Sequence, residues 1–296
     1  MYTALMLLKS PLSDLERLNF LSPQQAAQLT SQFGSPVFVY DESTLIERGK
    51  QAMAFPAAFG LTVRYAMKAN PLAAILRTFS DLGIHIDASS SYEAHRAIRA
   101  GIPAGHIMLT SQELPSDLSS LVEQGVLYNA TSLHQLESYG QLFPGGSVSV
   151  RINSGLGSGH TRSVSVAGTT SSFGIWHEEL PAVHELASRY QLKISTIHSH
   201  IGCGADPAIW EQAAKLTLNI LEKFPDATTL NLGGVQCYYY YAGSDSPVDY
   251  TLNSCTGGYV AGDVVSLSSG SVVSLTVQDG YCTQTTVVQA DLSGTT

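Results

Sequence analysis

The run Tyr65-Ala-Met-Lys-Ala-Asn-Pro71 decides how this 296-residue chain is interpreted. Residues 61–67 read as an apolar strand, with Gly60 before it and the Asn70-Pro71 pair closing it. Lys68 therefore lies at the carboxyl end of the strand, where burial of its amine would favour the neutral, nucleophilic form. Such a lysine is a candidate for Schiff-base chemistry with an aldehyde cofactor or a carbonyl substrate. The competing interpretation is a lysine whose stem covers apolar surface while its amine stays in water, and Lys68 alone does not decide between them.

Alternating strand and helix patterns follow Lys68 along the chain. Further strands are predicted at 84–87, 106–110, 126–129, 147–151, 193–198 and 228–232, and helices at 71–82, 92–100, 117–124, 132–139, 178–190 and 208–224. Repeated βα units joined by short loops are typical of a parallel (β/α) barrel. The series has seven strands, whereas a closed barrel of this kind has about eight. The predicted fold is therefore α/β, an incomplete (β/α)8-type barrel.

Polar residues that could carry chemistry fall at or just after the carboxyl ends of these strands. They are Lys68, Asp87, Asn129, Arg151, His198, His200 and the Gly233-Gly234 pair. In parallel barrels this end carries the active site. The sequence therefore predicts that these residues share one site.

Composition excludes several classes of partner. The net charge is -9 without any basic cluster, which argues against binding to nucleic acid or to an anionic membrane surface. The apolar N-terminus has no basic leader and is interrupted by Lys9, so we expect neither a signal peptide nor a membrane span, and a cytoplasmic enzyme. The 4 cysteines lack paired metal-ligand spacing, so no metal site is predicted.

A change in composition near residue 235 predicts the domain boundaries. Every Lys, Arg, His and Glu lies before residue 236, and the rest of the chain is rich in Ser, Thr, Gly, Val and Tyr. We expect an N-terminal segment over residues 1–40 with a strand at 36–40, the barrel over 41–235, and a β-rich or partly disordered tail over 236–296.

Several motifs, in the same order along the chain, resemble those of the alanine-racemase-type, pyridoxal-phosphate-dependent decarboxylases. The motifs are Gly34-Ser-Pro-Val-Phe-Val-Tyr-Asp41, the Lys68 run, Ile84-His-Ile-Asp-Ala-Ser89, Arg151-Ile-Asn153, Ser172-Phe-Gly-Ile175, His198-Ser-His-Ile-Gly202 and Asn231-Leu-Gly-Gly234. The resemblance covers roughly residues 10–235 and is strongest to the diaminopimelate decarboxylase branch. It implies that pyridoxal 5'-phosphate is the cofactor and that meso-diaminopimelate is decarboxylated to lysine. Ornithine, arginine and carboxynorspermidine stay open as other substrates.

The resemblance also implies roles for individual residues. Lys68 would form the Schiff base with pyridoxal phosphate, and His200 would stack on one face of its pyridine ring. Gly233 and Gly234 would let backbone N–H groups approach the phosphate. Cys203 stands where the family usually has a phosphate-binding serine, and a thiol is the weaker donor.

Asp87 and Arg151 are expected to support the cofactor, with structural salt bridging as an equal alternative. The family's motifs for an eighth barrel strand, for an acidic partner of the pyridine nitrogen and for residues completed by a second subunit do not follow Val235. The homodimer that the resemblance implies is therefore doubtful here. Since the acidic partner makes the ring a better electron sink, a barrel fragment that binds pyridoxal phosphate weakly without turnover is the alternative function.

Overall fold

The computed structural model describes residues 20–156, 168, 171–200 and 207–234, together with three tail strands, β9 (Val264–Ser266), β10 (Val272–Ser274) and β11 (Thr286–Asp291). Contacts divide the chain into two compact units, residues 1–44 and 45–296. Within the described ranges, no helix has both the length and the apolar character needed to cross a membrane.

The first unit contains helix α1 (Pro23–Phe33) and the start of α2 (Glu42–Met53). Ser22 caps α1: its hydroxyl accepts from the Gln25 N–H, and the Gln25 side chain accepts from the Ser22 N–H. The strand predicted at 36–40 is not formed, because residues 37–40 lie in neither helix nor strand and the Phe38 side chain is 86% exposed. A strand requires a hydrogen-bonded neighbour, and none of the described strands pairs with this segment.

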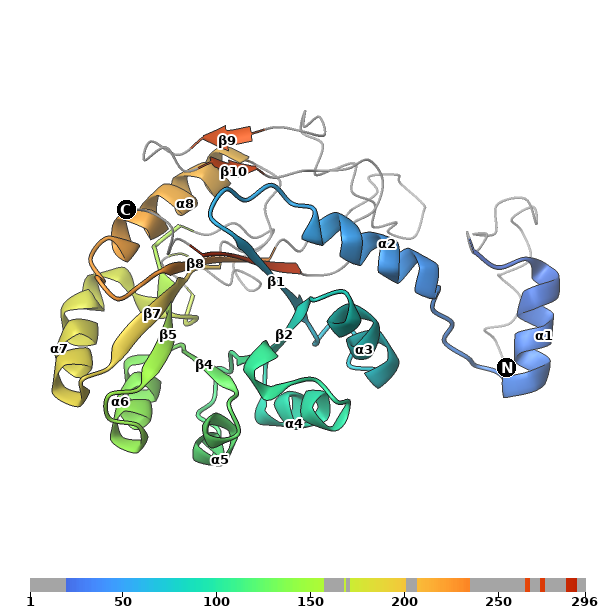
Figure 1. The fold of residues 1–296 in the computed structure, drawn as a ribbon, viewed down its shortest axis with the longest axis horizontal. Coiled ribbons are helices and arrows are strands. Elements are labelled where there is room, and N and C mark those ends of the chain that lie inside the picture. The colour runs from blue at the N-terminus through green and yellow to red at the C-terminus, as the bar shows by residue number, and fades with distance from the viewer. Residues whose placement is uncertain are drawn as a thin grey trace, which may run out of the picture. The chain divides into compact units, whose positions relative to one another are not determined.

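Seven parallel strands form the curved sheet of the second unit (Figure 1). They are β1 (Leu61–Ala66), β2 (His85–Ala88), β3 (Ile107–Leu109), β4 (Leu127–Ala130), β5 (Ser147–Asn153), β7 (Lys193–His198) and β8 (Thr229–Gly234). The short strand β6 (Ile175–Trp176) pairs, among the described strands, with the end of β5 alone. The predicted α/β fold is confirmed, and β7 has the predicted bounds.

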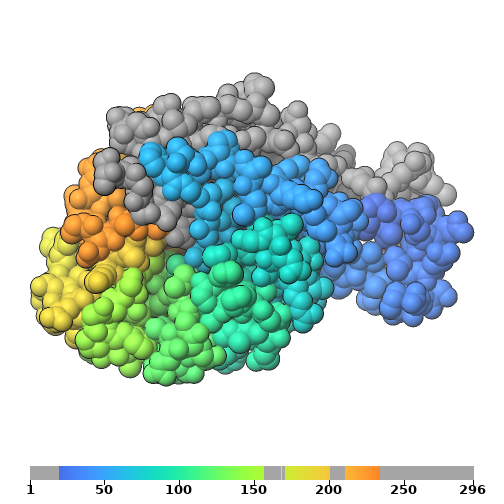
Figure 2. Space-filling model, in the orientation of Figure 1, coloured from blue at the N-terminus to red at the C-terminus, as the bar shows by residue number. Residues whose placement is uncertain are grey.

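Helices follow the strands on the outer side of the sheet (Figure 1). They are α3 (Ala73–Asp81), α4 (Ser91–Arg99), α5 (Leu118–Glu123), α6 (Leu133–Leu142), α7 (Leu180–Tyr190) and α8 (Pro207–Leu221). The hydroxyls of Ser90 and Ser132 cap α4 and α6. In Figure 2 the surface colour changes in chain order from teal over α3 and α4 to yellow over α7, as expected where each βα unit lies beside the preceding one.

The position of an eighth barrel strand is taken by a strand from the tail. β11 pairs antiparallel with β1 on one side and with β8 on the other. β4 pairs with β5, so the strand order closes on itself. Among the described strands, seven parallel strands make up the barrel, as predicted, and the antiparallel β11 bridges the edges at β8 and β1.

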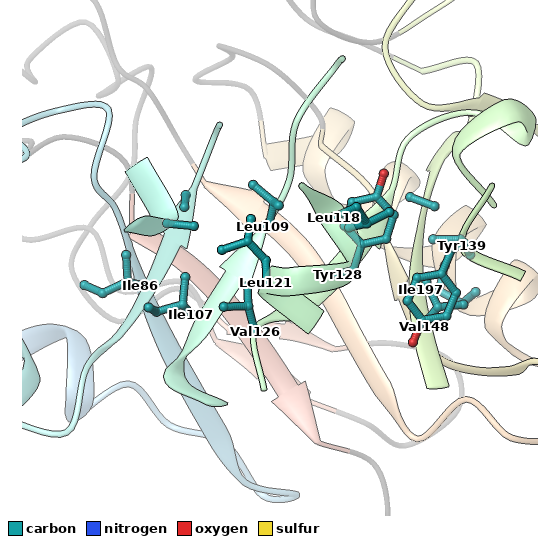
Figure 3. Close-up of a cluster of buried hydrophobic side chains, with 14 of the residues drawn as sticks. Ile86, Ile107, Leu109, Leu118, Leu121, Val126, Tyr128, Tyr139, Val148 and Ile197 are labelled. Carbon is teal, nitrogen blue, oxygen red and sulfur yellow. The ribbon is translucent and has the colours of Figure 1, made fainter. Parts of the chain in front are cut away.

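The two faces of the parallel strands differ in chemistry. Ile86, Tyr128 and Ile197 belong to the buried apolar cluster that includes residues of the surrounding helices (Figure 3). The next residues along the chain, Asp87, Asn129 and His198, belong to a set of polar side chains linked by hydrogen bonds. Because side chains alternate between faces along a strand, the apolar set faces the helices and the polar set lies on the inner face. Most barrels of this class fill the interior with branched apolar side chains, so a polar interior suggests a site.

Candidate active site

The predicted residues Lys68, Asp87, Arg151 and His200 come together at the carboxyl ends of β1, β2, β5 and β7. Their proximity is visible in their electrostatics: Lys68 and Arg151 both act on the pKa of Asp87 and on that of His200. Four segments that are far apart in the chain therefore meet at one end of the barrel, as their positions after parallel strands require.

Lys68 lies in the turn after β1, and its side chain is exposed. The turn is held on both sides: the Met67 N–H donates to the Asp87 carbonyl at 3.1 Å, and the Tyr65 hydroxyl donates to the Asn70 carbonyl at 3.3 Å. Of the two interpretations of Lys68, the structure favours an amine in water, because β1 ends at Ala66 and the chain has already turned at Lys68. The exposed amine is directly accessible to a carbonyl compound.

Asp87 is the acidic centre of the cluster. Burial raises its pKa to about 6, against the hydrogen bond from Thr110 and the charges of Arg64, Lys68 and Arg151, which lower it. The Thr110 hydroxyl donates to Asp87 Oδ1 at 2.9 Å.

Arg151 is held between a charge and an aromatic ring. Burial lowers its pKa to about 10, while the Asp87 carboxylate acts in the opposite direction. Its guanidinium carbon lies 5.3 Å from the centre of the Phe173 ring, within the range of a cation–π contact. Gly174, with φ of +83°, passes so close to β5 that an added Cβ would lie 3.2 Å from the Arg151 carbonyl oxygen. This glycine explains the Ser172-Phe-Gly-Ile175 motif, since it allows Phe173 to approach Arg151.

His200 follows β7 and lies against Gly233. Burial, with the charges of Arg151 and Lys68, lowers the His200 pKa to about 3, so the imidazole is neutral. Gly233 has φ of +72°, and an added Cβ would lie 2.5 Å from His200 Nδ1. The Gly233 N–H donates to Asn231 Oδ1 at 2.9 Å. Gly233 therefore gives the imidazole its space, a role that the sequence did not indicate, and its predicted contact with phosphate stays a prediction.

The structure gives less information on two further predicted site residues, Gly234 and Cys203. Gly234 ends β8 and is the register partner of Val287 in β11. Cys203 lies outside the described residues. The expected contact of each with phosphate stays a prediction.

The structure adds residues that the predicted site did not contain. Thr110, Ser149 and Phe173 contact predicted site residues or the side chains beside them. Asn129 and His198 were predicted to share the site because they lie at strand ends, but without roles of their own. The missing signal was the alternation within strands, such as Val148-Ser-Val-Arg151, which assigns these polar side chains to one face.

The site can accommodate an anionic aldehyde cofactor. An exposed primary amine and a buried guanidinium act electrostatically on a neutral imidazole, and the imidazole fits against the bare backbone of Gly233, where a side chain would collide with it. Within the described part of the chain, no group of three His, Cys, Asp or Glu side chains could hold a metal ion.

Comparison with known proteins relates these features to relatives. The diaminopimelate decarboxylase of Escherichia coli (strain K12) is 32% identical over 232 residues, which are 76% of this chain and 54% of that protein. The enzyme of the same name from Streptomyces coelicolor is 36% identical over 191 residues, 63% of this chain and 42% of that protein. The chain thus spans about half the length of the curated relatives that it matches.

Solved structures give the same relationship. A crystal structure of diaminopimelate decarboxylase superposes with a TM-score of 0.64 at 30% identity, covering 76% of this chain and 53% of that one. A lysine/ornithine decarboxylase from Vibrio vulnificus, complexed with putrescine, has a TM-score of 0.58 at 20% identity, covering 71% and 56%, and shares the fold.

A family model described as "Pyridoxal-dependent decarboxylase, pyridoxal binding domain" matches residues 45–250. This match covers the seven parallel strands and all predicted site residues, from Lys68 to Gly234. The family and the class of cofactor predicted from the motifs are thereby confirmed. The chain belongs to the pyridoxal-dependent decarboxylases and carries their pyridoxal-binding domain.

Proposed function

We propose that this chain binds pyridoxal 5'-phosphate through Lys68 and acts as an amino-acid decarboxylase, with meso-diaminopimelate as substrate and lysine as product. The observation that carries the proposal is the meeting of the exposed Lys68 amine with Arg151 and His200 at one end of the barrel. Curated relatives named diaminopimelate decarboxylase, at 32% and 36% identity, support this substrate over ornithine, arginine or carboxynorspermidine.

Each residue has a task that follows from its geometry. Lys68 supplies the amine that links to the cofactor aldehyde. The neutral His200 presents a flat face, which is fixed on one side by Gly233. Arg151 supplies positive charge for the anionic groups of cofactor and substrate. When bound, the cofactor supplies an electron sink for the bond that breaks on loss of carbon dioxide.

A second function is favoured by the tail. β11 occupies the place between β8 and β1 with antiparallel direction, where a parallel barrel would have its eighth parallel strand. A barrel with this arrangement could bind pyridoxal phosphate without turning over substrate. The homodimer, the cytoplasmic location, the domain boundaries at residues 40 and 235 and the roles of Cys203, Gly233 and Gly234 stay predictions.

Binding of pyridoxal phosphate at Lys68 can be tested apart from turnover. Pyridoxal phosphate added to the purified full chain, followed by borohydride reduction, should label the peptide that contains Lys68. Lys68→Ala should abolish the label because alanine has no amine, whereas Lys215→Ala, which alters an exposed lysine on α8, should keep it. Labelling at another lysine in the unsubstituted chain would contradict the site.

Turnover is measured separately, by release of carbon dioxide from meso-diaminopimelate, ornithine and arginine. Release from meso-diaminopimelate above the other two supports the decarboxylase. Labelling of Lys68 without release of carbon dioxide from any of them supports the binding-only function. The family's motif for an acidic partner of the pyridine nitrogen does not follow Val235, and loss of one such transition-state contact lowers a rate by about a hundredfold to a thousandfold.

A further inference from the structure

A chain of hydrogen bonds crosses the inner face of the barrel from Asp87 to His198. The Thr110 hydroxyl lies 2.9 Å from Asp87 Oδ1, and Asn129 Nδ2 lies 3.3 Å from the Thr110 hydroxyl. The same amide nitrogen lies 2.7 Å from His198 Nδ1. These hydrogen bonds join β2, the residue after β3, β4 and β7, and His198 is the register partner of Arg151 in β5 and precedes His200 by two residues.

The chemistry of these side chains fixes which group donates and which accepts in each hydrogen bond of the series. An ionised carboxylate can only accept hydrogen bonds, so the Thr110 hydroxyl must give its single proton to Asp87. Thr110 then faces Asn129 with lone pairs, and Asn129 must present its NH2 group rather than its carbonyl oxygen. The second hydrogen of that NH2 group points to His198 Nδ1, which must therefore accept.

Ser149 supports the same orientation of the Asn129 amide from the other side. Its hydroxyl donates to Asn129 Oδ1 at 2.9 Å, which places the amide oxygen toward β5. Asn129 is fully buried and Ser149 is 3% exposed, so water does not compete for these groups. Both ends of the amide are thus satisfied in one orientation.

We propose that Asn129 is a positioning residue that holds His198 as the neutral imidazole with its proton on Nε2. The Asp87 carboxylate fixes which group donates in each hydrogen bond between them. The charged and titratable groups that act on His198 are Arg151 on β5 and His200 after β7. Burial, followed by these two neighbours, lowers the His198 pKa well below its ordinary value. The positive charge that acts on Asp87 then comes from Arg64, Lys68 and Arg151, and the neutral His198 adds none.

The state of His198 is a property of the protein without cofactor, so it can be tested apart from the proposed function. The full chain is labelled with 15N-histidine, and long-range 1H–15N spectra are recorded at pH 7. The signal of His198 is identified by its loss in His198→Gln. We expect the pattern of a neutral imidazole protonated at Nε2. A proton on Nδ1, or an imidazolium, in the unsubstituted chain overturns the proposal.

Two variants test the order of donors and acceptors between Asp87 and His198. In Asn129→Asp the new carboxylate can only accept, so a proton should appear on His198 Nδ1. The matched control Asn219→Asp makes the same change at an exposed position of α8 and should leave the spectrum unchanged. An unchanged His198 pattern in a folded Asn129→Asp protein overturns the role of Asn129.

If Asn129→Asp does not fold, Thr110→Val keeps the side-chain shape and removes the hydroxyl that connects Asp87 to Asn129. We expect a measurable population of the Nδ1-protonated form, because only the Ser149 hydroxyl then orients the amide, and a hydroxyl can accept a hydrogen bond as well as donate one. A His198 pattern identical to that of the unsubstituted chain would show that Asp87 does not impose the direction.

Discussion

The two faces of the same barrel strands are held by different interactions: apolar burial on the side that faces the helices, and hydrogen bonds on the inner side. The outer residues of β2, β4 and β7, Ile86, Tyr128 and Ile197, hold the helices by apolar burial. The inner residues beside them, Asp87, Asn129 and His198, hold one another by hydrogen bonds. Apolar burial depends on area and tolerates many arrangements, whereas each hydrogen bond depends on one donor and one acceptor. The outer face should therefore supply most of the stability at neutral pH, and the inner face should set the protonation states of the site and the dependence of stability on pH.

The largest expected effect comes from acid, which acts mainly on the inner side of the barrel. In the folded chain the pKa is about 3 for His200 and about 4 for His85, against 6.5 ordinarily, and that of His198 is also lowered. Unfolding therefore takes up protons below pH 6.5, so stability should fall as pH decreases from about 6.5 toward 4. Asp87, with its pKa raised from 3.8 to about 6, acts in the opposite direction within this range.

Urea midpoints followed by far-UV circular dichroism from pH 7.5 to 4 measure this slope. Three histidines outweigh one carboxylate, so the net slope should be positive with pH. His200→Gln should make the slope shallower. Stability that increases on acidification from pH 6.5 to 4.5 would show that the carboxylate dominates.

The next largest effect should come from the outer face. Leu121 of α5 is fully buried in the apolar cluster (Figure 3). Leu121→Ala should lower the free energy of unfolding by about 2–5 kcal/mol, the range for a buried leucine that leaves a cavity. Leu142→Ala, at a side chain that is 50% exposed, should cost far less. Urea denaturation of both variants measures the difference, and equal losses would argue against the outer face as the main source of stability.

A smaller effect tests the contact between Gly233 and His200. Gly233→Ala and Gly145→Ala both place a Cβ on a backbone with positive φ, +72° and +77°. This strain alone should lower the free energy of unfolding by about 1–2 kcal/mol in each variant. An added Cβ at Gly145 meets nothing within 4 Å, whereas at Gly233 it meets His200 Nδ1. Gly233→Ala should therefore cost more and should also shift the His200 signals in the 15N-histidine spectrum. Equal costs without a shift would mean that the imidazole moves aside freely.

The smallest effect isolates one inner hydrogen bond. Ser149→Ala removes the donor to Asn129 Oδ1 and should cost about 1 kcal/mol, the usual net value of a neutral hydrogen bond. Ser188→Ala, at an exposed position of α7, is the matched control. Thermal unfolding of both proteins compares them, and a loss of several kcal/mol in Ser149→Ala alone would place the inner face among the main sources of stability.

The order and type of the barrel elements could be predicted because each depends on local pattern. The strand predicted at 193–198 is β7 (Lys193–His198), and the helix predicted at 178–190 contains α7 (Leu180–Tyr190). β6 was missed because a strand of 2 residues has too short a pattern to detect. The strand predicted at 36–40 failed for the opposite reason, since its pattern is suitable but a strand also needs a neighbour.

By itself the sequence determined the βα series, the position of the polar residues at strand ends and, through its motifs, the family. Only the tertiary structure decided that Lys68 is exposed, that β11 lies between β8 and β1, and that Asn129 contacts a histidine 69 residues away. The physical reason is that periodicity acts over a few residues and assigns each side chain to a face. Which side chains meet on the inner face depends on the register and curvature of strands distant in the chain, and these are determined by packing of the whole sheet.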